Sequence, residues 1–233
     1  EDSLLAGSPV FLVADGMGGH RAGDYASRFL VEELHKYLES AEEGPTVRLL
    51  ERGIRRVNEE LFRLSSENDE LRGMGSTLVS AVIEGKLLTI SNIGDSRAYL
   101  IAQGSIVQLT TDHSALQEAK EFAQRTGADL VLPPSNVITR ALGAAMPELP
   151  QADYVLTPMC EGDVVLVCSD GVHGVLSNED ILSVVSDNAS PQEIANALVD
   201  QALAAGTRDN ATALVVRAQS VVGSRYDGDI RAS

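Results

Sequence analysis

The stretch VFLVADGMGGHRAG, residues 10–23, decides the fold. It opens with an apolar run, residues 10–14, whose short length and β-branched and aromatic side chains predict a buried strand that ends on Asp15. Glycines follow at once, and a residue without a Cβ lets the backbone turn sharply and approach a ligand closely. The sequence therefore predicts a carboxylate held at a strand end beside accessible backbone.

Two other aspartates flank apolar runs. Residues 164–169 lead into Asp170, and Asp209 precedes the run at residues 211–216. Mg²⁺ and Mn²⁺ prefer carboxylate and carbonyl oxygens, and aspartates at several strand ends can converge. The pattern indicates a site for one of these ions, although each aspartate taken alone is most simply a loop carboxylate that caps backbone N–H groups.

Length and charge limit the possible functions. The chain has 233 residues and no Pro/Gly/Ser-rich linker, which favours one domain, residues 1–218, with a mobile polar tail at residues 219–233. Its 34 acidic and 18 basic residues give a net charge of −16, which repels nucleic acid and anionic membranes. We expect neither as a partner, and we expect a monomer.

Cysteine content and hydropathy indicate a cytoplasmic protein or domain. Cys160 and Cys168 do not suggest a disulfide framework, and there is neither a signal-peptide pattern nor an apolar run of 18 residues. A chain that opens at Glu1 without Met also fits a fragment of a longer, membrane-anchored parent.

Hydrophobic periodicity predicts an α+β fold. Two amphipathic helices precede residue 69, and two more start at capping boxes, near residues 179–185 and 191–203. An antiparallel meander is expected between the pairs, and the intervening stretch 115–135 is mixed helix and loop. The expected strands cover residues 77–83, 87–93, 98–102, 106–109, 137–139, 154–156 and 164–168. Strands this numerous, with helices segregated in sequence, suggest two face-to-face sheets with helices outside.

Seven motifs carry a family resemblance. They are VADGMGGH (13–20), GSTL (75–78), NIGDSRAYL (92–100), LTTDHS (109–114), ITRALG (138–143), VCSDGV (167–172) and TRDNAT (207–212). In this order they resemble the type 2C (PPM) metal-dependent protein serine/threonine phosphatases, especially the bacterial branch. The resemblance covers nearly the whole chain and implies a four-layer α-β-β-α sandwich.

The resemblance also implies a metal site with two Mn²⁺ or Mg²⁺ ions and a bridging water. Asp15 would bridge the ions and the Gly16 carbonyl would bind one of them, while Asp170 and Asp209 would hold the other. Glu1 and Asp2 resemble the end of the family's opening motif, which serves the second ion. In the family an arginine four positions before the Glu1 equivalent binds the substrate phosphate, so we expect the native chain to extend upstream.

Some positions depart from the family pattern or have a simpler explanation. Asp112 resembles a ligand for a third, weaker ion shared with Asp170, but Gly174 stands where many relatives have a supporting Asp. Residues 95–97, Asp-Ser-Arg, are interpreted as a structural turn. His20 is a candidate general acid, although an ion-bound water is the simpler proton donor and a loop histidine is more often structural.

The sequence thus predicts hydrolysis of phosphoserine and phosphothreonine on proteins, in opposition to a serine/threonine kinase. Residues 112–136 form the expected flap beside the site and the determinant of substrate choice. One alternative is a pseudophosphatase that keeps the fold as a regulatory binding module. A second is a two-metal phosphodiesterase or nuclease, which the charge of −16 disfavours.

Overall fold

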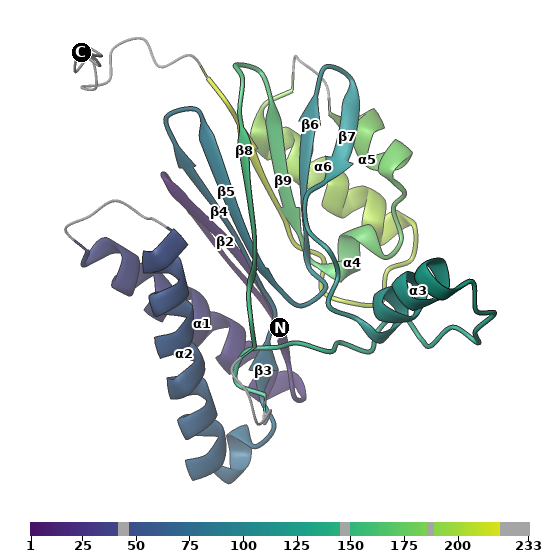
Figure 1. The fold of residues 1–233 in the computed structure, drawn as a ribbon. Helices are drawn as coiled ribbons and strands as arrows, with labels where there is room; N and C mark the ends of the chain where they lie inside the picture. The colour runs from purple at the N-terminus through teal and green to yellow at the C-terminus, as the bar shows by residue number, and fades with distance from the viewer. Residues whose placement is uncertain (42–46, 145–149, 186–188, 220–233) are drawn as a thin grey trace, which may run out of the picture.

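The computed structural model describes residues 1–41, 47–144, 150–185 and 189–219, so residues 220–233 of the predicted tail lie outside the described part. Two antiparallel sheets face each other, and helices cover both outer faces (Figure 1). This arrangement confirms the predicted α+β class and the four-layer α-β-β-α sandwich. No helix within the described ranges is both long enough and apolar enough to cross a bilayer.

The two sheets draw their strands from both halves of the chain. The first has the order β1-β2-β4-β5-β8, with β3 paired to β2, and the second has the order β10-β9-β6-β7. The first-sheet strands are β1 (Asp2–Gly7), β2 (Val10–Met17), β3 (Gly75–Ser76), β4 (Leu78–Glu84), β5 (Leu87–Ile93) and β8 (Asp153–Pro158). The second-sheet strands are β6 (Arg97–Ala102), β7 (Ser105–Gln108), β9 (Val164–Cys168) and β10 (Ala213–Arg217).

The alternation of side chains along each strand explains the layers. In β2, Leu12 faces the helices outside the sheet, whereas the next residue, Val13, lies in the core between the sheets. In β9, Leu166 faces the outer helices and Val165 faces inward. Strands that are buried on both faces must be apolar throughout, which is why both runs were readable in the sequence.

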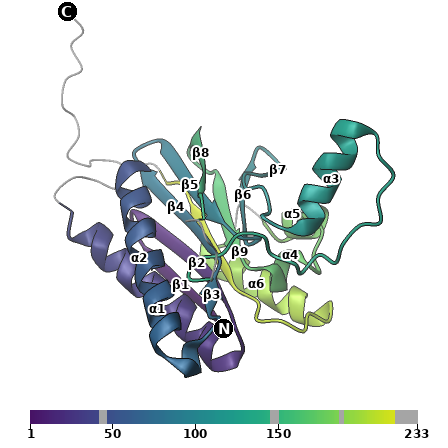
Figure 2. The same cartoon turned by 60° about the horizontal axis from the view of Figure 1, so that its bottom comes forward.

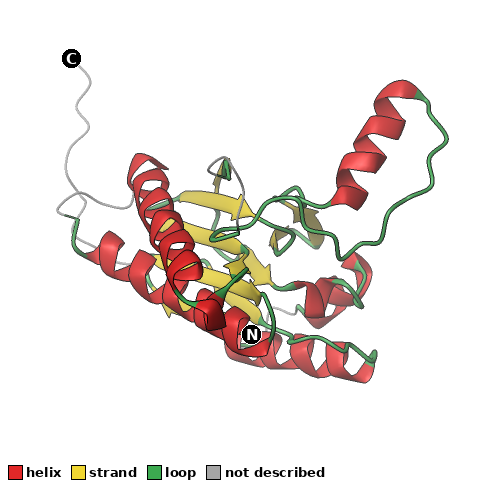
Figure 3. Ribbon diagram, turned by 90° about the horizontal axis from the view of Figure 1, so that it is seen from below, coloured by secondary structure: helices red, strands yellow, loops and turns green. Residues whose placement is uncertain are grey.

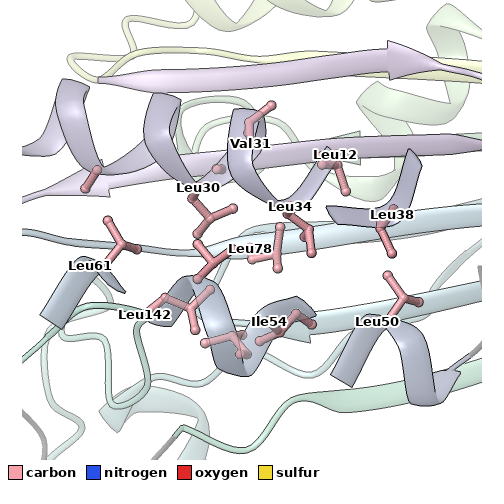
Figure 4. Close-up of a cluster of buried hydrophobic side chains, with 14 of the residues drawn as sticks. Leu12, Leu30, Val31, Leu34, Leu38, Leu50, Ile54, Leu61, Leu78 and Leu142 are labelled. Carbon is pink, nitrogen blue, oxygen red and sulfur yellow. The ribbon is translucent and has the colours of Figure 1, made fainter. Parts of the chain in front are cut away.

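Different helices cover the outer faces of the two sheets. The first sheet is covered by α1 (His20–Glu39) and α2 (Val47–Glu67), whose leucines fill the core shown in Figure 4. The short helix η1 (Asp69–Leu71) follows. The second sheet is covered by α4 (Asp170–His173), α5 (Asn178–Val184) and α6 (Pro191–Ala204). Both predicted capping boxes are present, with Ser177 starting α5 and Ser190 starting α6.

Helix α3 (Ala115–Thr126) differs from the α-helices that cover the sheets because none of its residues is buried. It projects away from the sandwich, as Figures 2 and 3 show from two further directions. Ser114 caps its first turn and also bridges Ile138, so the base of the projection is tied to the body. The predicted flap, residues 112–136, therefore contains a helix standing beside the sheets.

Three sequence predictions about the fold were wrong or incomplete. The expected meander is two hairpins in different sheets, because the chain crosses from β5 to β6 at Gly94, whose φ of 106° suits glycine. Residues 137–139 do not form a strand. Ile138 makes only an isolated antiparallel bridge with Ser114, and the chain continues from Ser114 into α3. Strand β1 and helix α4 were not predicted.

Candidate active site

The predicted ligands gather where the first strands of one sheet meet the end of β9. Asp2 of β1 lies directly opposite Asp15 of β2 in the antiparallel register. The strand does not end on Asp15 as predicted, because Gly16 and Met17 continue it by pairing with β3. Asp15 is thus fixed inside a strand rather than placed on a free loop.

Hydroxyl groups hold the backbone of Asp15. The N–H of Asp15 donates to Oγ1 of Thr77 at 3.0 Å, and the N–H of Thr77 donates to the carbonyl of Asp15 at 2.8 Å. Thr77 Oγ1 also lies 2.9 Å from Oγ of Ser96, which precedes β6 in the other sheet. These buried contacts join the two sheets at the site, a role that sequence analysis did not assign to the GSTL motif.

Ser169 makes a similar junction on the other side. It is fully buried, and its hydroxyl donates to Oδ2 of Asp2 at 2.7 Å while accepting from the N–H of Thr212 at 3.1 Å. Asp170 follows it as the first residue of α4. One serine therefore connects the start of the chain, the end of β9 and the segment before β10.

Asp209 is more open than the other predicted ligands. It is exposed on the segment before β10, and its Oδ1 accepts from the N–H of Asn210 at 2.9 Å. Its charge nevertheless acts on both Asp15 and Asp170. The structure therefore brings Asp209 near the cluster without burying it.

The electrostatics of the cluster are unfavourable without a cation. Burial raises the pKa of Asp15 to about 9, and the charges of Asp2 and Asp170 add to this effect. Burial also raises the pKa of Asp170, with Asp209 and Asp2 adding to it, and the pKa of Asp2. One oxygen of Asp2 and one of Asp170 are buried and have no hydrogen-bond partner. Buried polar atoms usually have partners, so these oxygens are available to a ligand.

The backbone is packed tightly around the carboxylates. A Cβ on Gly16 would lie 2.0 Å from the carbonyl oxygen of Gly23, and a Cβ on Gly171 would lie 2.0 Å from that of Asn210. Glycine is required at both positions because no side chain fits. The N–H of Gly16 also donates to the carbonyl of Glu1 at 3.3 Å, which places the first residue beside the cluster.

These residues fit hard divalent cations. The described residues form no preassembled group of three or more Asp, Glu, His or Cys side chains around one point. Mg²⁺ does not need such a cage, since it keeps several waters and is typically held by one or two carboxylates. Unpartnered, mutually repelling carboxylates beside glycine backbone meet that requirement.

Asp112 has a different environment from the other predicted ligands. Both of its oxygens accept hydrogen bonds from Arg97, at 2.8 and 2.7 Å. Its neighbour Asp95, interpreted from sequence as a turn residue, is 4% exposed and has an oxygen without a partner. Burial, with repulsion from Asp170, raises the pKa of Asp95 to about 7. Sequence analysis missed this carboxylate because an Asp-Ser pair between strands is commonly a turn.

His113 and His173 make hydrogen bonds within the fold. His113 is buried, accepts from the N–H of Gly94 at 3.1 Å and donates through Nε2 to Asp153 at 3.1 Å. Nε2 of His173 lies 2.9 Å from the carbonyl oxygen of Asp95, and burial lowers the pKa of His173 to about 4. The side chain of His20 lies outside the described residues.

Buried carboxylates with unpartnered oxygens, at one end of two facing antiparallel sheets, are suited to binding divalent cations. The Protein phosphatase 2C family profile matches residues 2–205, and the chain belongs to this family. The serine/threonine phosphatase stp of Listeria monocytogenes serotype 4b is 35% identical over 215 residues, covering 89% of this chain and 84% of that protein.

Solved structures agree with this assignment. PppA, described as a regulatory component of the type VI secretion system in Pseudomonas aeruginosa, matches with a TM-score of 0.82 and 33% identity over 93% of this chain and 90% of that one. The catalytic domain of the serine/threonine phosphatase PstP in complex with two manganese ions matches with a TM-score of 0.78 and 31% identity. The match covers 92% of this chain and 89% of that one.

Proposed function

We propose that this phosphatase hydrolyses phosphoserine and phosphothreonine on proteins with two Mn²⁺ or Mg²⁺ ions held at the carboxylate cluster. The observation that carries the proposal is the unpartnered, buried oxygens of Asp2 and Asp170 beside Asp15. A buried carboxylate oxygen without a partner lowers the stability of the fold unless a cation binds it. Among the described residues, no basic side chain is hydrogen-bonded to these oxygens.

The residues divide between the two ions as the family pattern suggests. Asp15 would contact both ions and the Gly16 carbonyl would contact one, while Asp170 and Asp209 would hold the other. Glu1 and Asp2 would serve the second ion. When bound, two such ions lower the pKa of a shared water and neutralise phosphoryl oxygens.

The protein's own contribution is orientation. Thr77 holds the backbone of Asp15 from both sides, and Ser169 fixes one oxygen of Asp2 so that the other points away from it. Groups held in this way need no rearrangement when charge develops on the substrate. Asp209, being exposed, can adjust as ions enter.

The substrates we propose are phosphoproteins, including a serine/threonine kinase or its targets. The relatives named as serine/threonine phosphatases support this choice. A pseudophosphatase would not need to keep Asp15, Asp170 and Asp209 together. A phosphodiesterase or nuclease remains disfavoured by the net charge of −16.

Phosphate release from a phosphothreonine peptide tests the proposal. We expect release with Mn²⁺ or Mg²⁺, none in EDTA, and none from a phosphate diester under the same conditions. Activity that persists in EDTA would refute the two-ion assignment. Binding of the phosphopeptide without turnover would favour the pseudophosphatase, and preferential cleavage of the diester would favour the phosphodiesterase.

A further inference from the structure

Arg97 and Asp112 form a closed ion pair next to the carboxylate cluster. Nε of Arg97 donates to one oxygen of Asp112 at 2.8 Å, and Nη2 donates to the other at 2.7 Å. The side chains are only 25% and 13% exposed. A planar guanidinium matches a carboxylate in this two-bond arrangement, which makes the pair stronger than one with a single contact.

Neighbouring side chains make further hydrogen bonds to Arg97 and Asp112. Nη1 of Arg97 lies 3.1 Å from the hydroxyl of Tyr99, which is fully buried. Gln108 donates to Asp112 at 3.2 Å and to the carbonyl of Thr110 at 2.8 Å. The register of the β6–β7 hairpin, in which Tyr99 faces Gln108, holds this set together.

The pair borders a cavity of about 250 Å³ between the sheets and α3. Its acidic lining comprises Asp95, Asp112 and Asp170, and its basic lining comprises Arg97 and Lys120. Asp95 and Asp170 each have a buried oxygen without a partner, whereas Asp112 has none. Of these three carboxylates, Asp112 is the one whose charge is balanced by a bonded side chain, that of Arg97.

We propose that Arg97 is the resident cation of Asp112 and occupies the place that a third divalent ion would take in this cavity. The inference rests on the proposed two-ion function, because it concerns how many ions the site accepts. An ion approaching Asp112 would have to displace a two-bond guanidinium and then lie against its positive charge. Gly174 adds no carboxylate to the cavity lining, so only Asp95 and Asp170 could offset this repulsion.

Calorimetric titration with Mn²⁺, supported by electron paramagnetic resonance of free Mn²⁺, tests the proposal without measuring activity. The variants are Arg97→Gln, Arg97→Lys, Asp112→Asn and the double variant Arg97→Gln/Asp112→Asn. Arg140→Gln is the control, because it removes a guanidinium that pairs with Asp153 instead of Asp112. Circular dichroism establishes that each variant is folded.

We expect Arg97→Gln to bind one more Mn²⁺ than the wild type, or to bind a weak last ion at least tenfold more tightly. Neither the double variant nor Arg140→Gln should show this gain. Arg97→Lys should give a smaller gain, since an ammonium cannot make both bonds. If Arg97→Gln does not fold, the proposal is judged by whether Arg97→Lys binds Mn²⁺ more tightly than both the wild type and Arg140→Gln.

Two results would overturn the proposal. One is a third Mn²⁺ in the wild type that disappears in Asp112→Asn and is unchanged in the folded Arg97 variants. The other is a gain that survives in the double variant. Failure of the wild type to bind any Mn²⁺ would contradict the proposed function instead, because the Arg97 inference is judged by the difference between variants.

Discussion

Two acidic regions lie next to each other at one end of the sandwich, and they differ in whether a basic side chain pairs with their carboxylates. Asp2, Asp15 and Asp170 are crowded together, and two of them have a buried oxygen with no partner. A short distance away, Asp112 has both oxygens engaged by Arg97. The described residues give the unpartnered oxygens of the first region no hydrogen-bonded cation, whereas in the second region Arg97 is bonded to Asp112.

The comparison shows what distinguishes a binding carboxylate from a structural one. All of these residues are aspartates near apolar stretches of the sequence. Neither residue type nor local sequence therefore distinguishes a binding carboxylate from a structural one. The difference is whether a guanidinium reaches the carboxylate in the folded chain. Paired carboxylates stabilise the fold, and unpaired ones weaken it until a ligand binds.

The largest expected effect comes from substitutions in the unpaired region. Asp15→Asn and Asp209→Asn should each reduce turnover of a phosphothreonine peptide by more than about a thousandfold, because ion-based charge stabilisation contributes several kcal/mol. Steady-state kinetics with saturating Mn²⁺ measures this. Circular dichroism should show an unchanged fold, and near-normal turnover in either variant would remove that residue from the site.

Although Asp15→Asn should abolish most of the turnover, it should stabilise the metal-free protein in EDTA. At pH 7 Asp15→Asn should raise the melting temperature by roughly 5 °C, the shift that about 2 kcal/mol gives in a domain of this size. The reason is that burial and the neighbouring carboxylates raise the pKa of Asp15 to about 9. Thermal melts of both proteins in EDTA and in Mn²⁺ measure the effect, and saturating Mn²⁺ should remove the advantage.

The sign of the pH dependence follows from that pKa. Asp15 binds its proton more tightly in the folded, metal-free protein than in the unfolded chain, so its contribution to stability falls as pH rises from 3.8 towards about 9. The melting-temperature advantage of Asp15→Asn in EDTA should therefore widen with pH over this range. An advantage that narrows with pH would contradict the electrostatic explanation.

Much of the fold could be predicted because its signals are local. The apolar runs of β2 and β9 and the capping boxes at Ser177 and Ser190 each depend on a few neighbouring residues. The crossing between sheets at Gly94 could not be predicted, since a turn between sheets resembles a hairpin turn in sequence. Strand β1 was missed because it lacks a clear alternation, with Leu4 exposed and Leu5 half-buried.

The sequence could offer candidate carboxylates for the site, but not how they are paired. The resemblance selected Asp15, Asp170 and Asp209 for the two main ions, and it gave Asp112 as a ligand for a third, weaker ion. Arg97 and Asp112 are 15 residues apart and meet only because the β6–β7 hairpin brings them together. Ser169 and Thr77 gave no signal of their roles, because a hydroxyl acquires its function from partners far along the chain.

A smaller effect is expected when the paired region is disrupted. Asp112→Asn should lower the free energy of unfolding by about 2 kcal/mol, because a partly buried charged hydrogen bond is lost. Calorimetry should show that the two main Mn²⁺ sites keep their affinity. Asp69→Asn removes an exposed ion pair with Arg72 and serves as the control, with almost no change in stability. Loss of the main Mn²⁺ sites in Asp112→Asn would show that the two regions are not separate.

The smallest effect concerns the hydroxyl that orients the unpaired region. Ser169→Ala removes the donor to Asp2 and the acceptor for Thr212, and it should cost about 1–2 kcal/mol of stability. Ser80→Ala breaks a buried contact of 2.6 Å with Ser91 inside the first sheet and provides a matched control for that cost. Only Ser169→Ala should also weaken Mn²⁺ binding, by about three- to tenfold, since orienting partners of ligands tune ion affinity. Calorimetry on both variants separates the two roles of the hydroxyl: equal Mn²⁺ affinity would mean that Ser169 only joins the sheets, whereas a selective loss would show that it prepares Asp2 for the ion.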